Sequence, residues 1–162
     1  MFFRFPFYRQ YDATDCGIAC LRMIARYYSK KVNMEWLRSR MPVSSEGVSL
    51  LSISESARLI GLKTIGVMVS FKQLSENAPL PCIAHWGQNH FVVIWRLRKK
   101  KKGWTIHVAD PAAGLLQYGE EEFLDKWQST RKNNEDRGVV LLLEPTTEFF
   151  SMDEIPDKTS LA

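Results

Sequence analysis

The chain has 162 residues and a formal net charge of +4, with 45% hydrophobic and 25% charged side chains. This composition is typical of one globular domain and excludes a disordered chain. The sequence has no apolar run near the ~20 residues that a bilayer crossing needs. The apolar start from Met1 to Phe7 is interrupted by Arg4 and Pro6, so it is unlike a signal peptide. We therefore expect a soluble domain.

The three cysteines, Cys16, Cys20 and Cys82, cannot all pair with one another. Their spacing fits neither a disulfide framework nor a zinc site. Cysteines that form no disulfide framework are typical of proteins in a reducing compartment. We expect a cytosolic location and no metal ligand set.

Helical patterning dominates the first sixty residues. Apolar residues recur at three- and four-residue steps after Asp15, which predicts a helix with Asp15 as its N-cap and Cys16 in its first turn. A second short helix is predicted from Asn33 to Met41. A third is predicted from about Ser49 to Leu59, with Ser49 as its cap.

Strand patterning dominates the rest of the chain. The predicted strands are Leu62 to Val69, Cys82 to Trp86, Phe91 to Arg98, Trp104 to Ala109 and Val139 to Leu143. Lys99 to Gly103 is predicted to be an exposed hairpin loop between the third and fourth strands. A short helix is predicted from Glu120 to Trp127, and an exposed loop from Arg131 to Arg137. Helices followed by an antiparallel sheet define an α+β fold.

The C-terminal segment has a different composition. From Pro145 onward Pro, Thr, Asp, Glu and Ser dominate, and residues 144–162 carry five acidic side chains against one lysine. We expect one domain over residues 1–144 and an acidic tail or linker over residues 145–162. Phe149 and Phe150 are apolar enough to dock locally.

Cys16 is the candidate nucleophile. A thiol attacks a carbonyl well only as the thiolate, and a free cysteine with a pKa near ~8.5 is mostly protonated at neutral pH. The unpaired N–H groups at a helix N-terminus and a nearby histidine both favour the thiolate. Cys20 lies one turn deeper on the same helical face, where a small packed residue is expected.

His90 and Asp110 are the candidate partners of this thiol. His90 lies where the polar turn of residues 87–89 meets an apolar strand, whereas His85 and His107 lie inside strands. Folding the chain about residues 99–103 brings His90 and Asp110 to the same end of the hairpin, where a base and its carboxylate must meet. The alternative for Asp110 is that it only begins a turn with Pro111.

Gln10 is a candidate oxyanion donor. It lies six residues before Cys16, across a polar turn. A side-chain N–H at this place, together with the backbone N–H of Cys16, would bind the oxyanion of a tetrahedral intermediate. The alternative is an ordinary surface glutamine, and the spacing alone leaves both open.

The segment from Arg9 to Ile24 resembles the opening of the C39 peptidase domains of bacteriocin-processing ABC transporters. That family carries a Gln, six residues later an Asp-Cys-Gly, then a His followed by Phe-Val-Val, and later an Asp-Pro. The matching blocks here, in order, are Gln10, Asp15-Cys16-Gly17, His90-Phe91-Val92-Val93 and Asp110-Pro111. The resemblance covers about residues 8–144.

The resemblance implies a papain-like cysteine peptidase fold, with the catalytic cysteine at a helix N-terminus in the helical half. It implies that Cys16 is the nucleophile, His90 the general base and then acid, Asp110 the group that orients His90, and Gln10 the oxyanion donor. The implied activity is an endopeptidase that removes double-glycine leader peptides from bacteriocins or similar secreted precursors, coupled to export.

The resemblance also implies partners. These are the leader peptide and the transmembrane and ATP-binding domains of the same or a partner transporter, with residues 145–162 leading toward the membrane. The expected place is the cytoplasmic side of the bacterial inner membrane. ATP and Mg²⁺ are expected only in the ATP-binding domain, so no cofactor is expected in residues 1–144.

Two other functions stay open from the sequence. The first is a catalytically silent domain that only docks leader peptides for an exporter. The second is a nucleic-acid-binding module that uses the basic run from Lys99 to Lys102. We favour an exposed turn for this run and expect no nucleic-acid partner.

Overall fold

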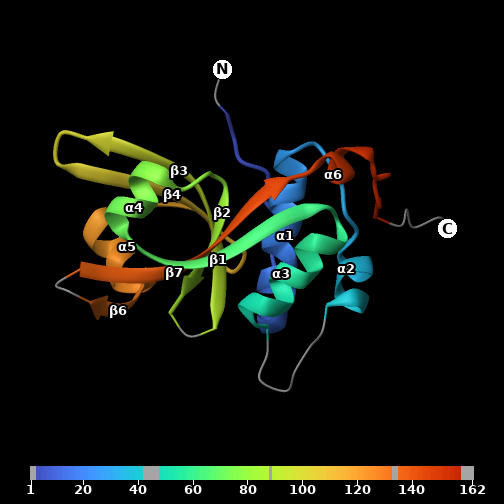
Figure 1. The fold of residues 1–162 in the computed structure, drawn as a ribbon, viewed down its shortest axis with the longest axis horizontal. Helices are drawn as coiled ribbons and strands as arrows, with labels where there is room; N and C mark the ends of the chain where they lie inside the picture. Colours follow the sequence, from blue (N-terminus) through green and yellow to red (C-terminus); the bar gives the residue numbers. More distant parts are fainter. Residues whose placement is uncertain (1–2, 42–47, 88, 133–134, 158–162) are drawn as a thin grey trace.

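The structure, a computed structural model, describes residues 3–41, 48–87, 89–132 and 135–157. Figure 1 shows helices α1 to α3 gathered on one side of a twisted sheet and helices α4 and α5 on the other. Within these ranges, no helix combines the length and the hydrophobicity that a membrane crossing requires.

The N-terminal half contains the three predicted helices. They are α1 (Cys16–Tyr27), α2 (Met34–Arg40) and α3 (Leu50–Leu59), with a short 3-10 turn, η1 (Ala13–Asp15), before α1. The Asn33 side chain accepts a hydrogen bond from the Trp36 N–H at the start of α2, and Ser49 and Ser52 form a capping box on α3. These helix predictions are confirmed.

Asp15 is the N-cap residue of α1, as predicted, but its side chain makes no capping hydrogen bond. Its carboxylate accepts hydrogen bonds from the Asp12 N–H and from Arg38 instead. Asp15 therefore joins α1 to its surroundings rather than closing the helix end.

In the described part of the chain, the sheet contains seven strands, and the neighbouring strands pair antiparallel. The strands are β1 (Leu62–Ser70), β2 (Cys82–Trp86), β3 (His90–Lys100), β4 (Gly103–Asp110), β5 (Gly114–Gly119), β6 (Gln128–Lys132) and β7 (Glu135–Pro145). Their order is β1-β7-β2-β3-β4-β5, and β6 pairs with β7. The predicted α+β class is confirmed. Lys99–Lys102 are exposed at the tip of the β3–β4 hairpin, as predicted.

Several short elements were not predicted. They are α4 (Phe71–Asn77), β5, β6 and α6 (Thr147–Ser151). The short helix α5 (Glu120–Trp127) was predicted and is confirmed. The loop predicted from residue 131 to residue 137 is wrong at 131–132, which belong to β6, and at 135–137, which belong to β7; residues 133–134 lie outside the described residues. Backbone N–H and C=O groups form the ladder, so a polar sequence does not prevent pairing.

The sheet separates two hydrophobic clusters. Alternate residues such as Ile83, Val93 and Leu141 face α1, α2 and α3. Their neighbours in the strands, such as Ala84 and Val92, face α4 and α5. Strands buried on both faces make the sheet a fixed platform on which α1 lies.

Gly17 allows α1 and α3 to approach closely. A Cβ at this position would lie 2.8 Å from the Cγ1 of Ile53 and 2.9 Å from the Cγ1 of Val48. A larger residue directly after Cys16 would therefore push the two helices apart.

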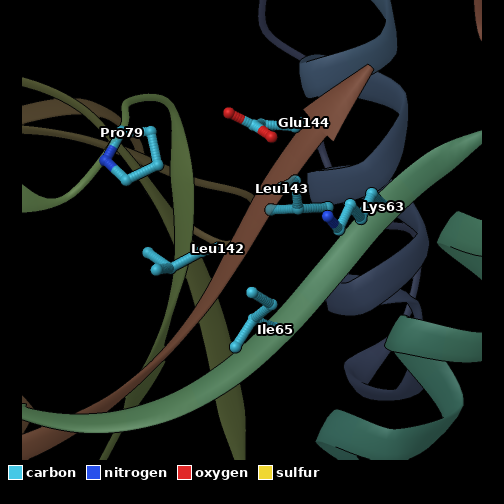
Figure 2. A pocket seen from close by; sticks show the side chains of 6 residues that line it. All are labelled: Lys63, Ile65, Pro79, Leu142, Leu143 and Glu144. Atoms are coloured by element: carbon cyan, nitrogen blue, oxygen red, sulfur yellow. The ribbon is translucent and has the colours of Figure 1, made fainter. Parts of the chain in front are cut away.

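A pocket of about 150 Å³ lies against β1 and β7. Figure 2 shows the side chains that line it, among them Ile65, Leu142, Lys63 and Glu144. Its lining is separate from Cys16, His90 and Asp110.

The described part of the C-terminal segment packs on the helical half. Phe149 of α6 is fully buried, and Lys30 donates hydrogen bonds to the carbonyls of Phe149 and, at 2.8 Å, Met152. The Ile155 N–H donates to the Lys31 carbonyl at 3.0 Å. The end of α1 is therefore held by residues 149–155. The boundary at residue 144 stays a prediction.

We expect Phe149→Ala to destabilise the protein by about 3–5 kcal/mol, because it empties a fully buried aromatic site. Phe150 is the matched control, since it is 63% exposed and its replacement by Ala is expected to cost less than ~0.5 kcal/mol. Urea unfolding of both variants measures the difference. Equal losses would show that the segment does not pack as described.

Candidate active site

Cys16 is placed by α1 and by the way α1 lies on the sheet. It is the first residue of the helix and is fully buried, next to unpaired N–H groups that carry partial positive charge. One turn later, the Cys20 thiol donates to the carbonyl of Phe91 at 3.3 Å. This contact sets α1 against β3 so that Cys16 lies beside His90, the residue before Phe91.

His90 and Asp110 meet at the end of the β3–β4 hairpin. His90 is the first residue of β3 and Asp110 is the last residue of β4. The Nε2 of His90 lies 2.7 Å from the Oδ1 of Asp110. Asp110 Oδ1 also accepts the Ala112 N–H at 2.9 Å, which fixes the carboxylate. The predicted meeting of these two side chains is confirmed.

The imidazole of His90 links the carboxylate to the thiol. Hydrogen bonds with Asp110 and then with the Cys16 side chain raise the pKa of His90 from 6.5 to about 9, against the opposing effect of burial. With Nε2 engaged by Asp110, Nδ1 is the nitrogen that faces Cys16. His90 is therefore an imidazolium at neutral pH.

The pKa of Asp110 shifts the other way. Burial by itself raises it, but the hydrogen bonds from His90 and from the Ala112 N–H outweigh burial and hold the pKa below its usual value. The carboxylate stays ionised beside the imidazolium. Asp110 thus holds the ring in place and stabilises its positive charge.

Gln10 is held at the same corner through its backbone. Its N–H donates to the carbonyl of Pro111 at 3.0 Å, and Arg9 donates to the carbonyl of Ala112 at 3.1 Å. The side-chain Oε1 of Gln10 is buried without a hydrogen-bond partner among the described residues. A half-turn about the last side-chain torsion exchanges this oxygen with the NH₂ group. A buried side-chain amide with an unsatisfied hydrogen-bonding group is suited to bind a ligand.

The remaining cysteines and histidines lie in other surroundings. Burial raises the pKa of the Cys20 thiol well above its usual range and that of Cys82 to about 12. Burial lowers the pKa of His85, which packs against Phe91, and that of His107, which packs against Trp95. Of the six cysteines and histidines, the geometry of the described residues joins only Cys16 and His90 in a cysteine–histidine pair.

Arg38 was not found from the sequence. It lies on α2 and forms an ion pair with the buried Asp15, with its Nη2 2.7 Å from Oδ2 of the carboxylate. The two residues are 23 positions apart, and nothing in the local pattern around Arg38 indicates this contact. Only the packing of α2 on α1 brings them together.

Comparisons with known proteins identify the family of the chain. The sequence model of the Peptidase C39 family matches residues 4–131. The colicin V secretion/processing ATP-binding protein CvaB of Escherichia coli is 30% identical over 148 residues, which are 91% of this chain and 19% of that protein. The lactococcin-G-processing and transport ATP-binding protein LagD of Lactococcus lactis is 29% identical over 156 residues, 93% of this chain and 20% of that protein. This chain thus spans about a fifth of these relatives.

Solved structures show the same fold. A double glycine motif protease from an AMS/PCAT transporter, in complex with the leader peptide, superposes with a TM-score of 0.72 at 33% identity and covers 87% of this chain and 91% of that one. The peptidase domain of Streptococcus ComA gives a TM-score of 0.72 at 21% identity, over 88% of this chain and all of that one. Fold, cluster and relatives together define a papain-like cysteine peptidase. The chain belongs to the Peptidase C39 family.

The link between His90 and Asp110 can be tested by titration. We expect the ring proton signals of His90 to titrate near pH 9, and the midpoint to fall toward 6.5 in Asp110→Asn, with a smaller fall in Cys16→Ala. Because the folded-state pKa is raised, charged His90 stabilises the fold fully below about pH 6.5, and this stabilisation is lost toward pH 9. NMR titration measures the midpoints, and an unchanged midpoint in Asp110→Asn would contradict the pairing.

Proposed function

We propose that this chain is the peptidase part of an ABC exporter and removes double-glycine leader peptides from bacteriocin-like precursors. The observation that carries the proposal is the continuous contact from Cys16 to His90 to Asp110. The substrate class is supported by the 33% identical protease solved with a leader peptide. The exporter is supported by the secretion/processing relatives.

The proposed reaction is acyl transfer through Cys16. In the reactive form of the pair, the proton resides on His90 and the Cys16 thiolate attacks the carbonyl after the second small residue. His90 then protonates the departing amine, and the leader remains as a thioester. A water molecule, deprotonated by His90, hydrolyses the thioester and restores the thiol.

Gln10 is proposed as a donor to the oxyanion. Its unpaired amide and the backbone N–H of Cys16 would bind the oxygen that becomes negative when the tetrahedral intermediate forms. Removal of one such donor in another enzyme costs roughly 3–4 kcal/mol of transition-state stabilisation. The fixed backbone of Gln10 means that only its side chain must turn.

The burial of Cys16 favours small residues next to the cut bond. Because the thiol has no exposed surface, a substrate must approach through a narrow space. Glycine or alanine at the two positions before the cut would enter with the least displacement of side chains. This is the steric reason that we propose for a double-glycine type of site.

The cellular location of the domain and its partner domains follow from the same proposal. We place it at the cytoplasmic side of the membrane, with the transmembrane and ATP-binding parts of the exporter as partners. The reaction uses only side chains of this chain, so we propose no cofactor for it. The exposed run from Lys99 to Lys102 is given no nucleic-acid role.

The test is cleavage of a synthetic peptide that carries a double-glycine leader. We expect Cys16→Ala to reduce cleavage below detection, because no other group in the cluster can form the acyl intermediate. Cys82→Ala is the control, because this thiol is buried in the cluster on the other face of the sheet, and it should retain cleavage. Mass spectrometry of the products measures both.

Two outcomes would overturn the proposal. Wild-type rates in Cys16→Ala would remove Cys16 as the nucleophile. Binding of the leader peptide without cleavage by the wild-type chain would favour the silent docking domain instead.

A further inference from the structure

A buried negative charge lies directly before the nucleophile. Asp15 is only 2% exposed and precedes Cys16 in the chain. Its Oδ2 accepts hydrogen bonds from Arg38 Nη2 at 2.7 Å and from the Asp12 N–H at 3.3 Å, and its Oδ1 accepts one from Arg38 Nε at 3.3 Å. Among the described residues, this carboxylate is therefore bonded to α2 and to the turn before α1.

This charge would oppose the chemistry if it were unbalanced. A carboxylate in a buried place repels a developing thiolate next to it, and the low polarity of the surroundings strengthens the repulsion. A buried charge that loses its partner is also strongly destabilising. The guanidinium of Arg38, in a two-pronged contact, supplies the compensating charge.

The same ion pair also fixes the segment that carries two site residues. The chain from Gln10 to Cys16 is tied at its first residue to Pro111, through a backbone hydrogen bond of 3.0 Å. Toward its other end it is tied to α2 by Asp15 and Arg38, and the Asp12 N–H bond closes the turn between them. Both the proposed oxyanion donor and the nucleophile depend on this short segment.

We propose that Arg38 is a positioning residue of the active site. Through Asp15 it holds the segment from Gln10 to Cys16 in place and offsets the charge beside Cys16. The proposal rests on the proposed function for its kinetic test, but its effect on the Cys16 thiol can be measured without a peptide substrate.

The matched variants are Arg38→Gln and Arg40→Gln. Both residues lie in the last turn of α2 and both are exposed, but Arg40 stacks on Trp36 whereas Arg38 pairs with Asp15. We expect Arg38→Gln to lower kcat for leader cleavage by about tenfold with KM within about twofold of wild type, because displaced reacting groups slow the chemical step more than binding. Arg40→Gln should match the wild type in both constants.

A double-variant cycle separates positioning from simple loss of structure. Arg38→Lys keeps the cation, and Asp15→Asn combined with Arg38→Gln removes both charges, so both should lie closer to wild type than Arg38→Gln alone. The substrate-free readout is the alkylation rate of Cys16 by iodoacetamide, located by mass spectrometry. It should fall in Arg38→Gln and rise again in the combined variant.

The outcomes are distinct for the two proposals. Failure of the wild-type chain to cut any leader peptide would count against the proposed function, and the alkylation rates would still test Arg38. Equal alkylation rates of Cys16 in the wild type and in Arg38→Gln would overturn the role of Arg38. It would also be overturned if the separate effects of Asp15→Asn and Arg38→Gln on this rate simply multiplied in the combined variant. If Arg38→Gln does not fold, Arg38→Lys replaces it throughout the cycle, and alkylation effects of Asp15→Asn and Arg38→Lys that simply multiply in their double variant overturn the role as well.

Discussion

The packing of α1 across β3 is the constraint on which the site depends. The helix is buried along ten consecutive residues from Cys16 to Ala25, so it can neither slide nor rotate without opening the core. The Cys20 thiol on the carbonyl of Phe91 fixes the register between helix and strand. Because His90 precedes Phe91, this register alone places the first turn of α1 beside the imidazole. The close contact at Gly17 keeps α3 near the same helix end.

Two charged pairs accompany the thiol. Asp110 and Cys16 together keep His90 protonated, so the site holds a positive charge next to the sulfur. Asp15, the residue before Cys16 in the chain, carries a buried negative charge that Arg38 balances. A cation beside the sulfur is the setting in which cysteine nucleophiles react.

Short-range sequence patterns predicted the helices and hairpins whose residues are close together in the chain. The periodicity after Asp15 gave α1, and the turn at residues 99–103 gave the hairpin that joins His90 to Asp110. The capping pair Ser70 and Gln73 would have revealed α4, because it marks a helix start even where the helix is short. The strand β5 gave no such signal, since its six residues include two glycines and it forms on the edge that β4 offers.

Contacts between segments far apart in the chain could not be predicted from the sequence. The hydrogen bond from Gln10 to Pro111 and the ion pair of Asp15 and Arg38 each join parts of the chain whose spacing carries no pattern. Each depends on tertiary packing that becomes defined only when the sheet is complete. The roles of Cys16 and His90 were predicted because family motifs mark them, whereas the supporting shell around them has no motif.

The central claim is that Cys16 attacks the carbonyl at the end of a leader peptide. It is tested most directly with a leader peptide that ends in Gly-Gly-chloromethyl ketone, which alkylates the attacking sulfur. Fragment mass spectrometry distinguishes Cys16 from Cys20 within one proteolytic peptide. We predict one label per chain, on Cys16, and none when His90 is replaced by Ala. A label on Cys20 or Cys82, or equal labelling without His90, would contradict the account.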